Sequence, residues 1–157
     1  MTVMTGIAVL AATLAAGVLI GLIMRRRDGR VRTVGNGTAD PRAAVTGADL
    51  GAELGERATL VQFSTAFCQP CRATRRVLGE VAGMVPGVRH VEIDAESRLD
   101  LVRRFDVLRT PTVLVLDGSG NVVKRASGQP RKADVIAALG AAVDGPSHGP
   151  SHQADNV

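Results

Sequence analysis

The amino-acid sequence predicts an α/β domain with a central mixed sheet flanked by helices, preceded by one N-terminal transmembrane helix. Residues 3–24 contain neither a charged residue nor a proline. Residues 46–143 alternate between segments with helical apolar spacing and segments typical of strands, in the order α β α β α β β α. Strands that alternate with helices belong to a sheet covered on both faces, which here begins parallel and ends in an antiparallel hairpin.

The chain therefore divides into four parts along its length. The expected parts are a transmembrane anchor with its basic flank at 1–27, a flexible linker at 28–45, the folded domain at 46–143 and a disordered tail at 144–157. The linker and the tail are assigned by composition, because both are polar, contain Gly and Pro, and show no periodicity. The tail also repeats the tetrapeptide GPSH.

The first predicted element is a helix over residues 3–24 that spans a membrane once. At 1.5 Å per residue it covers ~33 Å, enough for a hydrocarbon core of ~30 Å. A cleaved signal peptide is the alternative. It fits poorly, because no basic segment precedes the apolar run and Arg25–Arg27 stand where a cleavage site needs small residues. We therefore expect a retained single-pass anchor.

The charge around this helix predicts its orientation. Five arginines follow it within ten residues, whereas its N-terminal side has only the α-amino group. The positive-inside rule then places the folded domain in the cytoplasm, and an extracytoplasmic domain is the alternative. Residues 25–42 hold six Arg and two Asp, a net charge of +4 that equals that of the whole chain. We expect no nucleic-acid partner, which would need a basic stripe on the fold and usually stacking aromatics.

Inside the domain, local patterns place the elements. Thr46 can cap a short helix through about Leu54, with Asp49 completing a capping box, and Ser97 can cap the third helix. Residues 118–121 form a turn between the last two strands. The strands are expected at 58–64, 88–94, 112–117 and 122–127, and the longer helices at about 70–84 and 132–143.

The two cysteines, Cys68 and Cys71, limit the kinds of site that the chain can form. They are too few for a thiolate zinc site, and three scattered histidines do not complete one. They are also too few for the disulfide framework of a small secreted domain, which needs several pairs. We therefore expect neither a metal nor a cofactor. What remains is one pair with the spacing C-x-x-C.

This pair lies between a buried strand and the first turn of a helix. The N–H groups and the dipole at a helix N-terminus favour an anion, so the Cys68 thiolate is expected to be stabilised and its pKa lowered. Cys71, one turn later, is placed to attack a mixed disulfide formed at Cys68. Pro70 fits an early helix position, where no intrahelical N–H bond is lost. Two alternatives stay open: inert cysteines, or half of a zinc site completed by a partner.

Two segments resemble the signatures of the thioredoxin family. LVQFSTAFCQPCRATRRVL (60–78) is similar to the strand, active-site loop and helix, and RFDVLRTPTVLVLDGSGNVVKRASG (104–128) is similar to the second signature. The resemblance covers residues 47–143 in the family's element order. It implies a thioredoxin-like fold and a thiol–disulfide oxidoreductase that acts as a protein disulfide reductase.

The resemblance also implies residue roles. Cys68 would be the nucleophile and Cys71 the resolving thiol. Pro111 would follow a cis peptide bond and keep a substrate-binding backbone edge open beside Cys68. The substrate-binding residues implied are Phe67, Gln69, Pro70, Thr110 and Pro111. The implied partners are disulfide-containing protein substrates, a thiol or reductase as electron donor, and the membrane through residues 3–24.

Three positions depart from the family pattern. Gln62 stands where thioredoxins have a buried Asp that accepts the proton of the second cysteine, and a Gln cannot ionise. The loop has Gln69 rather than Gly, and Phe67 replaces a Trp. The loss of a general base is expected to slow deprotonation of Cys71. A membrane-tethered reductase is thus the main interpretation. An extracytoplasmic thiol exchanger for secreted proteins or cytochrome maturation, and a redox-inactive binding module, are the alternatives.

Overall fold

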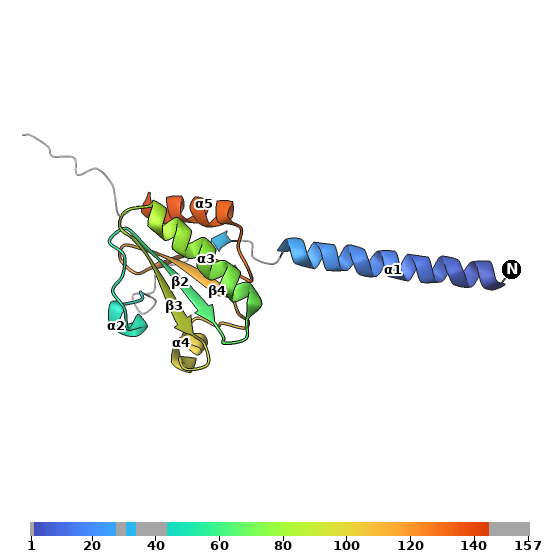
Figure 1. Cartoon of the computed structure of the whole chain (residues 1–157), viewed down its shortest axis with the longest axis horizontal. Helices are drawn as coiled ribbons and strands as arrows, with labels where there is room; N and C mark the ends of the chain where they lie inside the picture. Colours follow the sequence, from blue (N-terminus) through green and yellow to red (C-terminus); the bar gives the residue numbers. More distant parts are fainter. Residues whose placement is uncertain (1, 28–30, 34–43, 145–157) are drawn as a thin grey trace, which may run out of the picture.

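The structure of the chain is a computed structural model that describes residues 2–27, 31–33 and 44–144. Figure 1 shows a long N-terminal helix and a folded domain of strands and helices. The N-terminal helix is α1 (Thr2–Arg27). The domain contains β1 (Arg32–Thr33), α2 (Gly47–Leu50), β2 (Ala58–Ser64), α3 (Gln69–Met84), β3 (Val88–Asp94), α4 (Leu99–Arg104), β4 (Thr112–Asp117), β5 (Val122–Ser127) and α5 (Lys132–Val143).

The five strands form one mixed sheet in the order β1-β5-β4-β2-β3. β2 and β3 are parallel, while β4 is antiparallel to both of its neighbours, β2 and β5. This confirms the predicted central mixed sheet, with its parallel part first and its antiparallel hairpin last. β2 is an interior strand, between β4 and β3, and all seven of its residues are buried. An uninterrupted apolar run is the expected pattern for such a strand, because both of its faces are covered.

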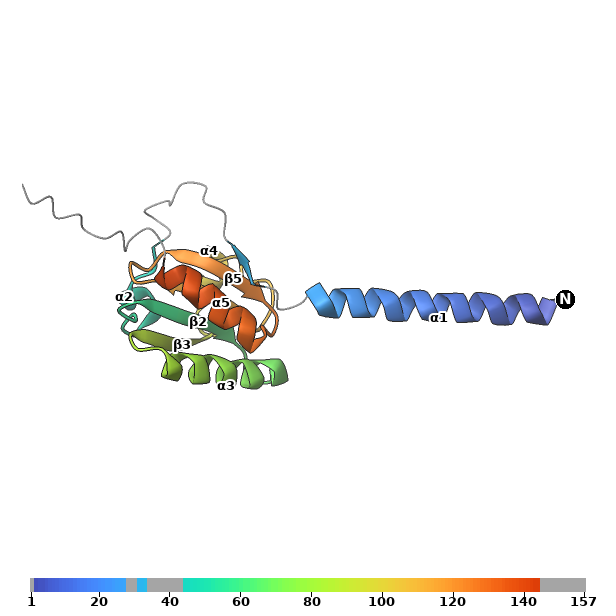
Figure 2. The same cartoon turned by 90° about the horizontal axis from the view of Figure 1, so that it is seen from above.

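Helices cover both faces of the sheet, and each face has its own apolar core. Leu60, Leu78 and Leu139 belong to the core between the sheet and the helices α3 and α5. Figure 2 shows these two helices beside the sheet. Leu50, Phe63 and Leu101 belong to the core on the face covered by α2 and α4. Because side chains alternate along a strand, residues 58, 60, 62 and 64 of β2 point towards the α3 side.

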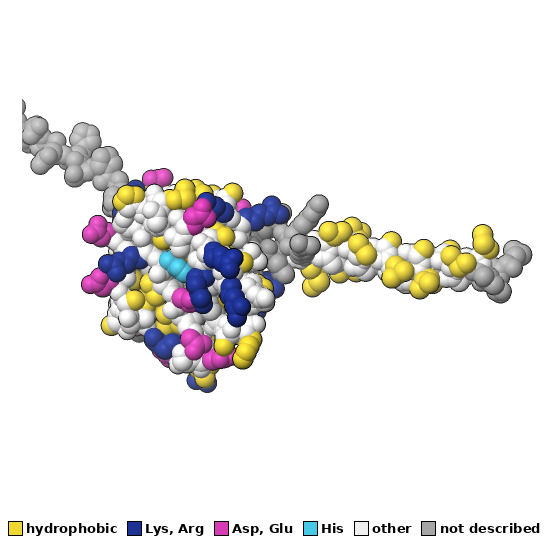
Figure 3. Space-filling model, in the orientation of Figure 1, with side chains coloured by type: hydrophobic (Ala, Val, Ile, Leu, Met, Phe, Trp, Pro, Cys, Tyr) yellow, Lys and Arg dark blue, Asp and Glu magenta, His cyan; other side chains and the backbone are white. Residues whose placement is uncertain are grey.

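α1 has the length and composition of a membrane-spanning helix over Met4–Met24, and none of that segment is buried in the structure. Figure 3 shows apolar side chains along its visible surface, in contrast to the many charged side chains on the domain. A helix exposing apolar groups around its circumference is unfavourable in water and favourable in lipid. A signal sequence near the N-terminus has the same features.

Two local predictions are corrected by the structure. The helix that Thr46 caps ends at Leu50 rather than near Leu54, because Gly51 adopts the left-handed conformation (φ 67°) and closes it. The predicted capping box is present, with Asp49 accepting from the Thr46 amide at 2.8 Å. Ser97 does not cap α4. Its hydroxyl donates to the Asp94 carbonyl instead, and α4 begins after Arg98 without a side-chain cap.

The segment 28–45, expected to be a flexible linker, contains structure in its described part. Arg32 and Thr33 form β1 and pair with Arg125 and Lys124 of β5. Val45 is buried at the other end of the segment. Residues 28–30 and 34–43, and the predicted tail from residue 145, lie outside the described residues.

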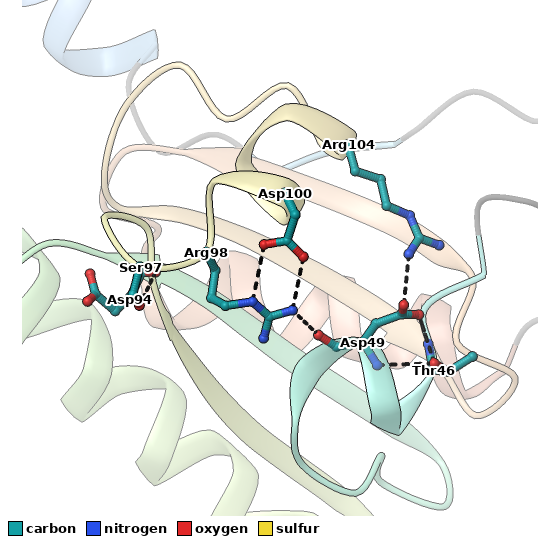
Figure 4. A network of polar contacts seen from close by, with 7 residues as sticks. All are labelled: Thr46, Asp49, Asp94, Ser97, Arg98, Asp100 and Arg104. Atoms are coloured by element: carbon teal, nitrogen blue, oxygen red, sulfur yellow. Dashed lines mark hydrogen bonds and ion pairs between the residues drawn. The ribbon is translucent and has the colours of Figure 1, made fainter.

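A polar network joins α2 to α4 (Figure 4). Arg98 donates to the Asp49 carbonyl and to the Asp100 carboxylate, and Arg104 contacts the Asp49 carboxylate at 3.2 Å. The hydrogen bonds from Thr46 lower the pKa of Asp49. Asp49 therefore remains ionised in this network, which holds the short α2 against α4.

Candidate active site

Cys68 is the N-cap residue of α3 and Cys71 lies in its first turn, and a disulfide bond joins them. β2 ends at Ser64, and three residues separate it from Cys68. The Cys71 amide donates to the Cys68 sulfur at 3.2 Å. This N–H of the first helical turn also donates to the Cys68 carbonyl at 3.2 Å, and it points at Cys68 Sγ in the arrangement that stabilises a thiolate after reduction. Pro70 follows Gln69 at the start of the helix, where a missing N–H has no consequence.

The two sulfurs differ in accessibility. Cys71 is only 1% exposed, whereas Cys68 is half-buried. An external disulfide therefore has a path to Cys68 but not to Cys71. This asymmetry is the requirement for a nucleophile that is attacked from outside and a resolving thiol that acts from within.

The second predicted segment lies beside the pair. The Thr110–Pro111 peptide bond is cis, which confirms the prediction for Pro111. The Thr110 hydroxyl lies 3.2 Å from that of Thr65, which belongs to the loop leading to Cys68. The Gly128 amide donates to the Pro111 carbonyl at 2.7 Å, so the end of β5 adjoins the same place. The structure thus brings both signature segments to one end of the sheet.

The residues predicted to bind substrate surround this end but differ in exposure. Phe67 is 98% exposed, and Gln69 and Pro70 are exposed beside it. Thr110 is half-buried, whereas Pro111 is buried. Only the first four therefore offer side-chain surface to a macromolecule.

A pocket of about 380 Å³ opens next to the disulfide. It is lined by both cysteines, by Arg72 and Arg75 of α3, and by Glu92 and Asp94 at the end of β3. Arg75 pairs with Glu92 at 2.6 Å. Burial raises the pKa of Glu92, but hydrogen bonds from Arg75 and Ser64 outweigh it and hold the pKa below its ordinary value. An ionised carboxylate thus shares a cavity with the redox pair.

Gln62 connects this cavity to the backbone of Cys71. Its amide nitrogen donates to the Cys71 carbonyl at 2.9 Å and to the Ser64 hydroxyl at 2.8 Å. A carbonyl oxygen only accepts, so the amide nitrogen must face Cys71 and the amide oxygen must face His90, 3.2 Å away. His90 Nε2 therefore carries a hydrogen. Burial lowers the pKa of the His90 imidazole, against the opposing effect of Glu92.

The described residues contain no group of three or more His, Cys, Asp or Glu side chains that could hold a metal ion. The disulfide also occupies both thiols, which are the strongest zinc ligands of the chain.

The family model described as Thioredoxin matches residues 44–141, more than half of the chain. The chain belongs to the thioredoxin family. Thioredoxin H5 of Oryza sativa subsp. japonica is 30% identical over 72 residues, which are 46% of this chain and 53% of that protein. The thioredoxin of Staphylococcus epidermidis is 27% identical over 89 residues, which are 56% of this chain and 86% of that protein. The chain spans about half the length of the first relatives that it matches, with 53% of the rice protein and 45% of Thioredoxin-2 of Pyricularia oryzae.

Solved thioredoxin structures share the fold. A thioredoxin from Nicotiana alata superposes with a TM-score of 0.51 at 25% identity, over 57% of this chain and 76% of that one. A mutant thioredoxin from Halobacterium salinarum gives a TM-score of 0.53 at 18% identity, over 57% of this chain and 77% of that one. This agreement confirms the predicted thioredoxin-like fold.

In this thioredoxin-family domain, the sequence prediction missed three polar residues near Cys71. Ser64, His90 and Glu92 all take part in the network around Gln62. The alternation along β3 was a usable signal, since it puts residues 88, 90 and 92 on one face of the sheet. The parallel register that sets Gln62 opposite Glu92 was needed to bring them to Cys71.

Proposed function

We propose that the chain is a membrane-anchored thiol–disulfide oxidoreductase that reduces protein disulfides through Cys68 and Cys71. The observation that carries the proposal is the asymmetric pair at the start of α3, with a reachable Cys68 and a buried Cys71. Family membership supports the same chemistry.

The proposed reaction has two exchanges. The Cys68 thiolate attacks one sulfur of the substrate disulfide, forming a mixed disulfide and releasing the other substrate sulfur as a thiolate. The Cys71 thiol loses its proton and attacks Cys68 Sγ, which releases the second substrate thiolate. Two protons complete the substrate dithiol, and the chain ends with the Cys68–Cys71 disulfide that the structure contains. A low-molecular-weight thiol or a soluble reductase then returns both electrons.

The proposed substrate surface consists of the backbone edge at Thr110–Pro111 and the exposed side chains of Phe67, Gln69 and Pro70. Its support is the position of these residues beside the half-buried Cys68. Phe67 offers a large apolar group next to the reacting sulfur, which suits an unfolded or extended substrate segment.

We further propose that α1 is a retained anchor and that the domain faces the cytoplasm. The uncharged span and the arginines after it support this orientation. Proteolysis of intact cells tests it. A domain that stays intact until the membrane is opened agrees with the proposal, and cleavage from outside contradicts it in favour of an extracytoplasmic exchanger.

Trapping with Cys71→Ser tests the chemistry. This variant is expected to accumulate mixed disulfides between Cys68 and substrate proteins, because the second exchange has lost its nucleophile. The matched control is Cys68→Ser, in which the remaining thiol is buried and is expected to trap nothing. Equal trapping by both variants, or none by Cys71→Ser, would favour a redox-inactive binding module.

A further inference from the structure

The short strand β1 joins the membrane helix to the domain at a defined place. Arg32 pairs with Arg125 and Thr33 with Lys124 at the free edge of β5. Val31, just before the strand, is partly buried against the core beneath α5. It shares a pocket with Ala137 and Ala138 of that helix. One apolar side chain and a pair of backbone partners therefore hold the start of the domain in place.

The direction of β1 places its entrance at the redox end of the sheet. β5 ends at Ser127, which pairs with Thr112 next to Pro111. Because β1 is antiparallel to β5, the residues before Arg32 lead towards Ser127, while those after Thr33 lead away from it. The described residues resume at Ala44, and at the opposite end of the sheet the Val45 amide donates to the Gly120 carbonyl at 2.8 Å. The membrane helix is thus connected from the side of Cys68.

The connection is also short. α1 ends at Arg27 and β1 begins at Arg32, so five Cα–Cα steps separate them and span at most ~18 Å. If β1 were not paired, the seventeen steps from Arg27 to Ala44 would allow up to ~60 Å. Three strand spacings, ~14 Å, separate β1 from β2 across the sheet. The redox pair therefore stays close to the end of the membrane helix.

The exposed apolar side chains at the redox end of the sheet suit a position close to the membrane helix. Phe67 and Leu108, in the loops that precede α3 and Pro111, are 98% and 85% exposed. Large apolar groups with this exposure are unfavourable in water and favourable at an interface or against a partner.

We infer that β1 turns the redox end of the domain towards the bilayer, so that the partner is a disulfide of an integral membrane protein close to the membrane surface. This inference rests on the proposed anchor and exchange chemistry. In the exchange, the partner's disulfide takes up the two electrons and two protons of the Cys68–Cys71 dithiol. A small dithiol added beforehand supplies them to the chain.

The orientation can be tested without the chemistry. In the full chain with Cys68→Ser and Cys71→Ser, a fluorophore is placed through Phe67→Cys at the redox end or Ser119→Cys at the opposite, exposed turn. Vesicles with nitroxide-labelled headgroups then quench whichever end lies near the bilayer. We expect a larger fluorescence loss at 67 than at 119. A ten-residue Gly/Ser insertion between Asp28 and Gly29 should reduce the difference. Equal quenching in the uninserted chain, or stronger quenching at 119, overturns the inference.

A second experiment tests whether the partner's disulfide has to lie close to the membrane surface. The pre-reduced chain is reconstituted with single-span reporters that carry one disulfide on a rigid helical spacer of ~10 or ~60 residues, about 15 or 90 Å long. We expect the reporter with the short spacer to be reduced faster. Val31→Asp, or the Gly/Ser insertion, should make the difference in rate between the two reporters smaller. Ile136→Asp is the control, because it puts the same charge at an exposed position of α5. Equal rates for both reporters contradict the inference. Failure to reduce even a soluble disulfide peptide contradicts the proposed function instead, and the quenching measurement still decides the orientation.

Discussion

Gln62 occupies the place where a general base is expected, yet it acts as a double hydrogen-bond donor. Both of its amide hydrogens are engaged, one by the Cys71 carbonyl and one by Ser64. Its oxygen accepts from His90. A fully buried amide with every group satisfied stabilises its surroundings, but it cannot take a proton from Cys71 at physiological pH. The slow resolving step therefore stays a prediction, because Gln62 itself supplies no base.

A carboxylate at position 62 is expected to speed that step. In Gln62→Asp, a base near Cys71 should raise the rate of resolution by ~10²–10⁴-fold when well positioned. The variant loses the two donated hydrogen bonds and buries a charge, so its melting temperature should fall, with a cost of about 1–3 kcal/mol. Stopped-flow resolution of a Cys68 mixed disulfide across pH measures the rate.

Gln62→Asn is the matched control, since Asn has the length of Asp without its charge. A gain seen with Asp but not with Asn identifies the base as the cause. Equal rates in the two variants would mean that Cys71 has another proton acceptor.

His90 is expected to make the free energy of unfolding depend on pH, in a higher pH range than Glu92 does. Burial lowers its pKa below the ordinary value of 6.5, so the unfolded chain takes up a proton before the folded one. Stability is therefore complete above pH 6.5 and is lost as the pH falls from there towards the folded pKa, by at most about 1.4 kcal/mol per pH unit. The pKa of Glu92 is lowered from its ordinary value of 4.5, so the stability that Glu92 contributes is lost only as the pH falls below 4.5.

His90→Gln should flatten the pH dependence between pH 6.5 and 5, because an amide can still donate to Gln62 but does not titrate. Chemical denaturation at a series of pH values measures the effect. An unchanged slope in the variant would assign the pH dependence to other groups.

Cys68 is expected to be the first cysteine alkylated in the reduced protein at mildly acidic pH. Its sulfur accepts from a helix-terminal amide and is half-buried, whereas Cys71 is 1% exposed. Mass spectrometry after brief treatment with iodoacetamide identifies the labelled residue. The same treatment in denaturant should label both cysteines alike, and preferential labelling of Cys71 in the folded protein would reverse the assigned roles.

At the scale of helices and strands, the sequence predicts the elements that have a clear apolar periodicity or a clear turn or capping motif. The boundaries of β2, β3, β4 and β5 agree with the predictions, because apolar runs and a turn at 118–121 define them. β1 was not predicted, since two residues carry no period and the pairing depends on the distant β5. The roles of His90 and Glu92 likewise depend on strand register. Local propensity does not contain that information.

The turn between β4 and β5 gives a test at this scale. Gly120 has a φ of +83°, and a Cβ there would lie 2.1 Å from the Val45 carbonyl oxygen. Gly120→Ala should therefore destabilise the domain by more than about 2 kcal/mol, through backbone strain and displacement of the segment at Val45. Thermal unfolding in detergent measures the effect.

Gly83→Ala is the control on α3, because a Cβ at that position meets nothing within 4 Å. It should stabilise the helix by about 0.5–1 kcal/mol. Similar melting temperatures for the two variants would show that the contact between Gly120 and Val45 does not constrain the fold.

At the scale of the whole molecule, α1 and the domain differ in where their apolar side chains lie. The domain buries its apolar side chains in two cores, whereas the span of α1 leaves its own apolar side chains unburied. α1 therefore contributes no described side chain to either core. β1 begins beyond α1 and belongs to the sheet, so the boundary between α1 and the domain lies between Arg27 and Val31.

Removal of residues 1–27 is accordingly expected to yield a soluble, folded and redox-active protein. The truncated chain keeps Val31 and β1, the cores on both faces of the sheet, and the Cys68–Cys71 pair. A second truncation that starts at Ala44 removes β1 as well. It should reduce a soluble disulfide at the same rate but melt at a lower temperature, because the packing of Val31 against the core is lost. Solubility without detergent, the melting temperature and the rate of disulfide reduction are the measurements. Aggregation of the first fragment, or loss of its exchange activity, would show that α1 is part of the fold.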